Sequence, residues 1–292
     1  MTEIETQTHS PNHRAHQQAL LTILQEFDRV CKALNIPYVL FAGTMLGAVR
    51  HQGFIPWDDD LDVLMMRKDY ERFMQEAPAV LDQEKFYLQK EFSDHWPMFF
   101  SKLRLNGTTC LEKFHPKDNQ LHQGVYIDIF PCDNALKHSW GRKIQFYASK
   151  VVIAKSLWKR GYETNSKKKK IFMEICRILP AKPFLRLVKS GAADSVYVHS
   201  FLGAGSAYSK NIYRRKCFDE VQNADFEGGQ YPIPTAYDEL LRTLYGEYMI
   251  LPPLEERAVK QHALLIDLEK SYENYENYRD GMKFDVHTRS IR

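Results

Sequence analysis

The chain has 292 residues and a net charge of +3; 44% of its residues are hydrophobic and 26% are charged. These fractions are those of a globular protein with a packed core and exclude a disordered or fibrous chain. No apolar run reaches the roughly 20 residues that a membrane-spanning helix needs, and the polar residues 1–14 lack the apolar segment of a signal peptide, which predicts a cytoplasmic protein.

The N-terminal half is predicted to alternate between helices and strands. Apolar residues that recur at spacings of three and four indicate amphipathic helices. Short apolar runs bounded by glycine or proline indicate strands. The elements expected up to residue 130 are a helix over 12–34, a strand over 38–41, a helix over 45–50, a strand over 61–66, a helix over 67–80 and strands over 86–89, 98–105 and 125–130.

The rest of the chain is predicted to be mainly helical. A helical period dominates 136–190, a hairpin over 218–231 turns at Gly228-Gly229, and helices follow Pro234 and the Pro252-Pro253 pair. This order predicts an α/β (α+β) fold in which helices flank a mixed sheet. The expected domains are a core over 12–135, a basic helical insertion over 136–215, and a C-terminal hairpin with helices over 216–278 that pack on the core.

The most informative feature is a run of aspartates before and within the strand predicted at 61–66. Because side chains alternate along a strand, Asp60 and Asp62 point to one face and the apolar residues between them to the other. Asp58 joins that face if the strand begins early, whereas Asp59 is expected to be structural. Two adjacent carboxylates repel each other unless a cation such as Mg²⁺ lies between them and a phosphate. The run alone leaves a solvated acidic loop as an equal alternative.

Two further features favour a phosphate-transfer site. Gly43 and Thr44 stand between a strand and a helix, where glycine lets the backbone approach a phosphate and the helix start attracts anions. Asp128 is an isolated charge in the apolar strand 125–130, and it is the third carboxylate that a nucleotidyltransferase site requires. The alternative is that backbone donors or an arginine satisfy Asp128. A strand, a Gly-Thr turn, a helix and a strand bearing Asp-x-Asp are together typical of nucleotidyltransferases.

With these motifs, the sequence resembles the LicD-type phosphocholine transferases, which belong to the nucleotidyltransferase superfamily together with the fukutin-related phosphoribitol transferases. The similar blocks occur in family order and span most of the chain. Two departures are Ala42, where the family more often has glycine, and Gln52, where a basic residue is common. The stretch 132–215 matches poorly, so the resemblance does not identify the acceptor. The similar blocks are 43–63, 100–109, 124–131, 245–253 and a basic segment that ends at His262.

The resemblance implies that 12–135 is a nucleotidyltransferase-like catalytic core. The implied reaction moves phosphocholine from CDP-choline, or another CDP-alcohol, to a hydroxyl of a cell-surface polysaccharide such as teichoic acid or lipopolysaccharide, and CMP leaves. The acceptor is then a glycan or polyol that is lipid-linked. Asp60 and Asp62 would hold one or two Mg²⁺ ions, with Mn²⁺ as an alternative, and Asp58 would be an outer ligand. Asp128 would complete this metal site or take the proton of the acceptor.

Several other residues are candidates for substrate binding. Arg50 is expected to bind a diphosphate oxygen, with an ion pair to Asp58 or Asp59 as the alternative. His51 is more commonly a packing residue than a catalyst. Aromatic faces are expected around the quaternary ammonium of choline. The substrate-binding candidates are Gly43, Thr44, Arg50, His51, Trp57, Lys102 and Tyr126, with Arg104 as a substitute for Lys102.

The positive charge of the chain is concentrated in residues 141–190. This segment holds fourteen Lys and Arg against two acids, a net +12, so the remainder of a chain whose total is +3 carries −9. Together with an apolar stripe, this predicts peripheral contact with anionic lipid on the inner face of the membrane. The alternative is a solvated basic face over an ordinary core helix. No nucleic-acid recognition module accompanies the basic residues, so no nucleic-acid partner is predicted.

Two other functions are compatible with the same features. A nucleotidyltransferase would direct attack at the α-phosphorus of a nucleoside triphosphate and release pyrophosphate instead of CMP. A non-catalytic membrane- or nucleic-acid-binding protein would depend on the basic segment and would tolerate the loss of Asp60 and Asp62.

Overall fold

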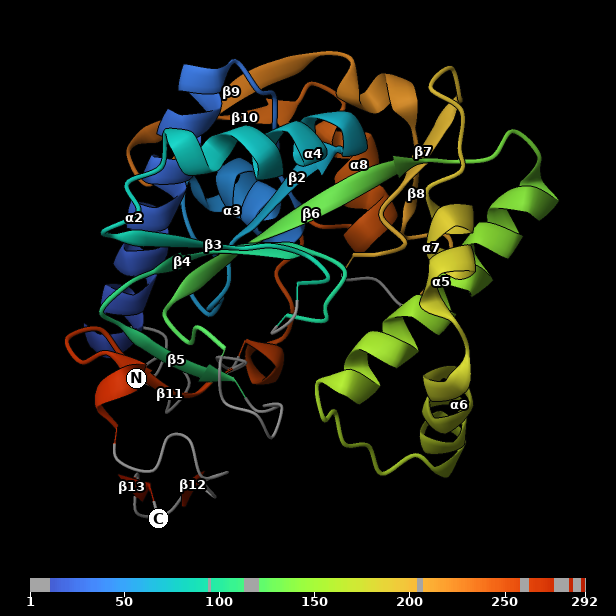
Figure 1. Ribbon diagram of the computed structural model, residues 1–292. Coiled ribbons are helices and arrows are strands. Elements are labelled where there is room, and N and C mark those ends of the chain that lie inside the picture. Colours follow the sequence, from blue (N-terminus) through green and yellow to red (C-terminus); the bar gives the residue numbers. More distant parts are fainter. Residues whose placement is uncertain are drawn as a thin grey trace.

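The computed structural model describes residues 11–93, 96–112, 121–203, 207–257, 263–275, 284–285 and 290–291. In this part of the chain a curled mixed sheet is flanked by helices, as Figure 1 shows, and the predicted α/β fold is confirmed. The helices are α2 (Pro11–Leu34), α3 (Ala42–His51), α4 (Arg67–Glu76), α5 (Ser139–Lys159), α6 (Lys167–Ile178), α7 (Ala181–Val188) and α8 (Tyr237–Tyr245). The strands are β1 (Val39–Leu40), β2 (Asp62–Met66), β3 (Phe86–Gln89), β4 (Ser101–Leu105), β5 (Thr109–Glu112), β6 (Tyr126–Asn134), β7 (Tyr197–His199), β8 (Ile212–Arg214), β9 (Val221–Phe226), β10 (Gly229–Pro234), β11 (Ala263–Asp267), β12 (Phe284–Asp285) and β13 (Ser290–Ile291).

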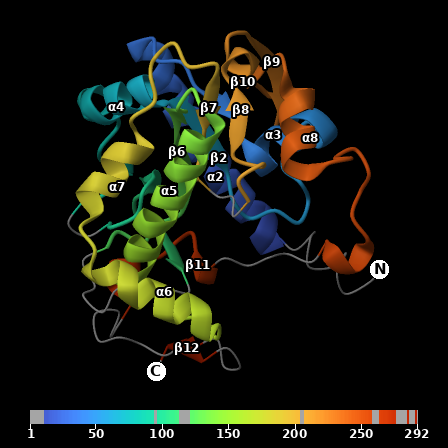
Figure 2. The ribbon, with the colours of Figure 1, turned by 90° about the vertical axis from the view of Figure 1, so that its right-hand side faces the viewer.

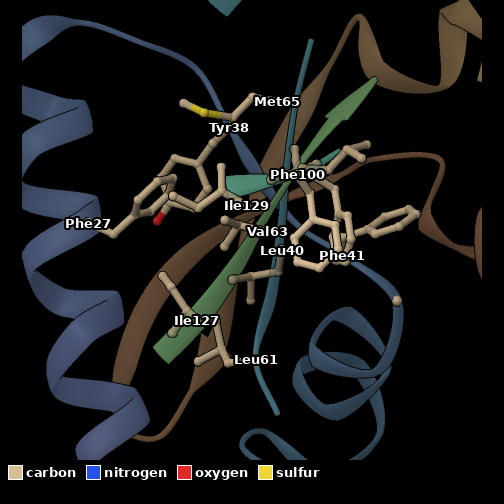
Figure 3. Packing of buried hydrophobic residues seen from close by; sticks show 14 of the residues in the cluster. Phe27, Tyr38, Leu40, Phe41, Leu61, Val63, Met65, Phe100, Ile127 and Ile129 are labelled. Atoms are coloured by element: carbon tan, nitrogen blue, oxygen red, sulfur yellow. The ribbon is translucent and has the colours of Figure 1, made fainter. Parts of the chain in front are cut away.

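The central sheet has the strand order β1-β2-β6-β4-β3, and β7 and β8 extend it from the far end of β6. The pair β2–β6 is parallel, whereas β1–β2, β4–β6 and β3–β4 are antiparallel. The apolar residues that alternate with the acids of β2 and β6, such as Leu61, Val63, Ile127 and Ile129, are buried in the main core. Figure 3 shows them gathered near Phe27 of α2. The sheet therefore buries one side of β2 and β6 and leaves their aspartates on the other.

Helices α5, α6 and α7 form a separate group beside the sheet, and β7 and β8 follow them in the chain (Figures 1 and 2). Helix α5 is the centre of this group because it contacts both α6 and α7. Among the described residues, no helix is long and apolar enough to cross a bilayer.

The region after Pro253 differs from the prediction. The polar helix predicted there is wrong: a short 3₁₀ turn at Leu254–Glu256 precedes the strand β11. Strand β11 pairs with β5, which the sequence did not reveal either. These two strands stabilise each other by pairing across more than 150 residues of sequence, so neither carries a strong local signal. The predicted hairpin is present as β9 and β10, with Glu227 and Gly228 at positive φ in its turn.

Candidate active site

The register of the sheet brings the acidic strand and the third predicted aspartate side by side. Asp62 on β2 pairs with Asp128 on β6, and Asp128 in turn pairs with Lys102 on β4. Residues opposite one another on neighbouring strands share a face of the sheet, so these three side chains form a row. Asp60 lies two residues before Asp62, in the segment that leads into β2.

The start of α3 fixes the position of the acidic strand. The Thr44 hydroxyl, which is buried, accepts a 2.8 Å hydrogen bond from the backbone N–H of Asp62, and its own proton stays available for donation. At Gly43, a Cβ atom would lie 2.7 Å from Asp58 Oδ2, so a larger residue there would make that carboxylate move. Thr44 thus fixes the backbone of Asp62, and Gly43 leaves space for Asp58 in its present position. Ala42, the departure from the family, has a φ of +46°, a conformation in which glycine would be unstrained.

The aspartates act on one another electrostatically. Burial raises the pKa of Asp62 well above its ordinary value. The neighbouring carboxylates raise it further, in the order Asp60, Asp128 and Asp58, whereas Lys102 opposes them. Four carboxylates therefore share one region of the molecule, and their mutual repulsion would be relieved by a bound cation.

The chemistry of this region fits Mg²⁺ or Mn²⁺. All four carboxylates, together with the Thr44 hydroxyl, offer hard oxygen ligands, which these ions prefer. Asp128 Oδ1 lies 3.1 Å from Lys102 Nζ in an ion pair that lacks hydrogen-bond geometry, so this buried oxygen has capacity for a further partner. Across the described residues, no three His, Cys, Asp or Glu side chains are close enough to count as a formed metal centre. The ligand set is thus inferred from the donor chemistry.

Lys102 is buried beside the aspartates, with an exposed fraction of 1%. Its Nζ lies 3.1 Å from Asp128 Oδ1, 3.3 Å from Glu112 Oε1 and 3.0 Å from the centre of the Tyr126 ring. Burial lowers the pKa of Lys102, and the two carboxylates oppose that shift. Lys102 thus neutralises two buried acids, and its role as a phosphate ligand remains a prediction.

Glu112 is a central residue that the sequence analysis missed. It lies on β5, accepts a 3.0 Å hydrogen bond from the Tyr126 hydroxyl, and forms ion pairs with Arg104 at 3.6 Å and with Arg160 at the end of α5. Burial alone would raise the pKa of Glu112, but the surrounding cations lower it. Trp96 packs against two of these cations, 4.5 Å from Arg160 and 5.7 Å from Arg104. Glu112 therefore links the helical group to the sheet next to Asp128.

Two arginines lie together near Trp57, which directly precedes the aspartate run. Arg50 Nη1 donates a 2.6 Å hydrogen bond to the carbonyl of Tyr248, and Arg257 Nε donates a 2.7 Å bond to the carbonyl of Pro252. Burial lowers the pKa of Arg50, and the positive charge of Arg257 lowers it further. One C-terminal segment thus holds both guanidinium groups, each with further N–H donors. Arg257 is not among the substrate-binding residues predicted from the sequence.

Tyr245 approaches the acidic region from the end of α8. The side chain is 45% exposed, but partial desolvation of its phenol and the carboxylates of Asp62, Asp58 and Asp60 raise the pKa of Tyr245. Tyr245 begins the segment 245–253, which is one of the blocks that resemble the family. Through Tyr245 this segment reaches the predicted aspartates. Tyr245 could not be assigned from the sequence because its distance to β2 depends on the packing of α8 on α3.

The aromatic candidates already contact cations of the protein itself. The Trp57 ring packs under Arg257 at 5.6 Å, and the Tyr126 ring packs under Lys102. His51 stands edge-on to Trp57 at 6.1 Å, and burial together with Arg50 lowers the pKa of His51. A protein cation thus already covers one face of each predicted ring, so a choline headgroup would have to use another face or displace that cation.

Comparison with known proteins identifies the family of the chain. The family model described as LicD/FKTN/FKRP, nucleotidyltransferase domain, matches residues 35–178, which include Asp60, Asp62, Lys102 and Asp128. The chain belongs to the LicD-type family. Of the blocks on which the resemblance was based, His262 lies outside the described residues.

Three relatives of this LicD-type chain differ in extent. It is 28% identical over 253 residues to the lipopolysaccharide cholinephosphotransferase LicD of Haemophilus influenzae. The matched stretch covers 84% of this chain and 94% of that protein. It is 43% identical over 124 residues to an uncharacterized protein of Rickettsia typhi, and the match covers 39% of this chain and 34% of that protein. An uncharacterized protein of Rickettsia prowazekii is 42% identical over 122 residues, or 41% of each chain. The first similarity covers nearly the whole length of both proteins.

Proposed function

We propose that this protein transfers phosphocholine from CDP-choline to a hydroxyl of a lipopolysaccharide- or teichoic-acid-type glycopolymer and releases CMP. The observation that carries the proposal is the row of Asp62 and Asp128 with Lys102, to which Asp58 and Asp60 add two further carboxylates. Similarity over 94% of a cholinephosphotransferase supports phosphocholine as the transferred group. We place the reaction in the cytoplasm, with a lipid-linked acceptor at the inner face of the membrane.

In the proposed reaction the acceptor oxygen forms a bond to the β-phosphorus of the donor. The bond from that phosphorus to the bridging oxygen breaks, and its electron pair leaves with CMP. Phosphoryl transfer depends mainly on positioning and on neutralising charge. Asp60 and Asp62, with Asp58 as an outer ligand, would hold Mg²⁺, which supplies positive charge to the diphosphate when it is bound. Asp128 either completes this set or accepts the proton that the acceptor hydroxyl loses.

Residues around the aspartates would orient the donor. Thr44 can donate its hydroxyl proton to a phosphate oxygen while it still accepts from the Asp62 N–H. Arg50 and Arg257 each use one guanidinium N–H to bond a backbone carbonyl, and their other N–H groups would bind further phosphate oxygens. Trp57 would contact the quaternary ammonium with the ring face that Arg257 does not cover.

The test is CMP release from purified protein and CDP-choline, with either Mg²⁺ or EDTA. Because the acceptor is not identified, slow transfer to water is the measured reaction. We expect metal-dependent CMP release that Asp60→Asn abolishes. Asp59→Asn is the matched control, since Asp59 is adjacent in the same run, whereas the carboxylates that raise the pKa of Asp62 are those of Asp60, Asp128 and Asp58. No CMP release and no binding of CDP-choline by calorimetry would contradict the choline assignment.

The same assay separates the proposal from its alternatives. CDP-ethanolamine, CDP-ribitol and CDP-glycerol would each release CMP if the transferred alcohol is not choline. A nucleotidyltransferase would instead release pyrophosphate from a nucleoside triphosphate. A non-catalytic binding protein would release neither product, and Asp60→Asn would leave its function unchanged.

A further inference from the structure

Helix α6 has two apolar faces, and only one of them is buried. Met173 and Cys176 pack on Ala154 of α5. Ile171, Ile175 and Ile178 lie on the other side, and their exposed fractions are 61%, 53% and 75%. Their spacing of four and then three residues aligns them along one side of the helix. We call these three residues the isoleucine stripe.

The isoleucine stripe has no function in the folding of the isolated molecule. Residues Met173 and Cys176 already attach α6 to the helical group, and Figures 1 and 2 show α6 at the outer end of that group. A contiguous apolar patch on the surface of a globular protein marks a site of interaction with a protein or a membrane. The stripe is therefore a surface that another structure covers.

The charges next to the stripe identify its partner. Lys167–Lys170 form the first turn of α6 and are all exposed, and that turn contains no acidic residue. The positive end of the helix dipole disfavours cations at this position, so the four lysines do not stabilise the helix. At the other end of α6, Arg177 is ion-paired with Glu174 at 3.4 Å, so the excess of positive charge on this helix comes from the four lysines. Lys169 donates a 2.9 Å hydrogen bond to the Tyr162 hydroxyl, and an anionic partner would account for the other three lysines.

We propose that the outer face of α6 docks on the surface of an anionic lipid bilayer. The isoleucine stripe would enter the boundary between headgroups and acyl chains, and Lys167, Lys168 and Lys170 would contact the lipid phosphates. A second copy of this chain fits less well, because self-association through the stripe would bring two lysine clusters together. A nucleic acid fits less well, because the isoleucine side chains have no hydrogen-bond donor for the phosphates of a nucleic acid. The proposal does not depend on the proposed transferase function, since α6 contributes no residue to the acidic region.

The test is sedimentation of the full-length protein with vesicles made of equal parts of phosphatidylglycerol and phosphatidylcholine. Pure phosphatidylcholine vesicles are the neutral comparison, and they also show any binding of the choline headgroup. The variants are Ile175→Ser with Ile178→Ser, and replacement of Lys167–Lys170 by Gln. The matched control is Val196→Ser with Val221→Ser, because these valines are 69% and 55% exposed but lie outside α6. Circular dichroism and urea midpoints check that each variant folds.

We expect binding to the anionic vesicles that weakens at high salt. The isoleucine variant should lower the partition coefficient at least tenfold, and the lysine variant about fivefold for each lysine removed. The valine variant should bind like the original protein. Equal binding to pure phosphatidylcholine, or full binding by the isoleucine variant, would overturn the proposal. A dimer in ultracentrifugation that the isoleucine variant dissolves, without vesicle binding, would also overturn it and would assign the stripe to self-association.

Discussion

Replacement of Lys102 by Met should strongly destabilise the protein. The ammonium of Lys102 is 1% exposed and lies between two carboxylates, at 3.1 Å from Asp128 and 3.3 Å from Glu112. Methionine keeps most of the volume of the side chain but removes its charge. The variant therefore leaves a buried negative charge without its counter-ion, which costs about 3–5 kcal/mol in measured cases. This is a large part of the 5–15 kcal/mol by which a typical domain is stable.

The surroundings of the two acids determine which one is left uncompensated. Glu112 keeps its ion pairs with Arg104 and Arg160 and its hydrogen bond from Tyr126. Asp128 has Lys102 as its only ion-pair partner among the described residues. The double variant Lys102→Met with Asp128→Asn should therefore recover most of the lost stability. Lys102→Met combined with Glu112→Gln should recover little, because that change neutralises the acid that is still paired.

The assay is equilibrium unfolding in urea at pH 7, followed by circular dichroism for the original protein and the three variants. Lys143→Met, at an exposed position on α5, is the control for loss of a lysine charge. An unchanged dependence of the free energy of unfolding on urea would show that the unfolded states are comparable. A loss below about 1 kcal/mol for Lys102→Met, or no recovery in the Asp128 double variant, would refute the reasoning. In the folded fraction, an unchanged KM for CDP-choline would assign Lys102 to positioning Asp128, whereas a raised KM would support a phosphate contact.

Substitutions at four other residues give separate tests. Thr44→Val should cost about 1–3 kcal/mol in the free energy of unfolding, because the buried N–H of Asp62 loses its acceptor, whereas Thr44→Ser should cost less; urea midpoints measure both. Asp62→Asn removes one of several carboxylates that repel one another, so it should raise the urea midpoint in EDTA; a lower midpoint would contradict this. The same variant should abolish CMP release, because it removes a proposed Mg²⁺ ligand. His199 has a pKa lowered to about 4 from 6.5 chiefly by burial, so it stays neutral while the unfolded chain takes up a proton. Stability should therefore fall by about 3 kcal/mol between pH 6.5 and 4, and His199→Gln should flatten that part of the urea-midpoint profile. Arg257→Ala should raise the KM for CDP-choline about tenfold if it binds a phosphate, and an unchanged KM would exclude that contact.

The local pattern of the sequence was sufficient to predict the acidic strand and the side chains on each of its faces. Alternation along β2 and β6 separates Asp62 and Asp128 from Val63 and Ile129, and the structure buries the apolar set in the core. This alternation depends only on the geometry of an extended backbone, so it can be read without knowing which strands are neighbours. The α/β class followed from the same period analysis.

Partners that are distant in the sequence were not predictable in this way. Glu112 shows no special pattern in its own segment, and it becomes central only because β5 pairs with β11 and α5 brings Arg160 to it. The helix predicted after Pro253 failed for the same reason, because strand pairing overrides a weak local preference. Arg257 and Tyr245 likewise depend on where the C-terminal segment packs.

The sequence by itself determined which residues are candidates for the chemistry: Asp58, Asp60 and Asp62, Asp128, and the Gly43-Thr44 turn that precedes α3. Their motifs are short, and each is defined by local backbone geometry. Only the tertiary structure decided what surrounds them. The register places Asp62, Asp128 and Lys102 in one row, and packing adds Glu112, Arg257 and Tyr245. The physical reason is that the charges of buried groups are balanced over a few ångströms in space, whereas their separations in sequence can exceed a hundred residues.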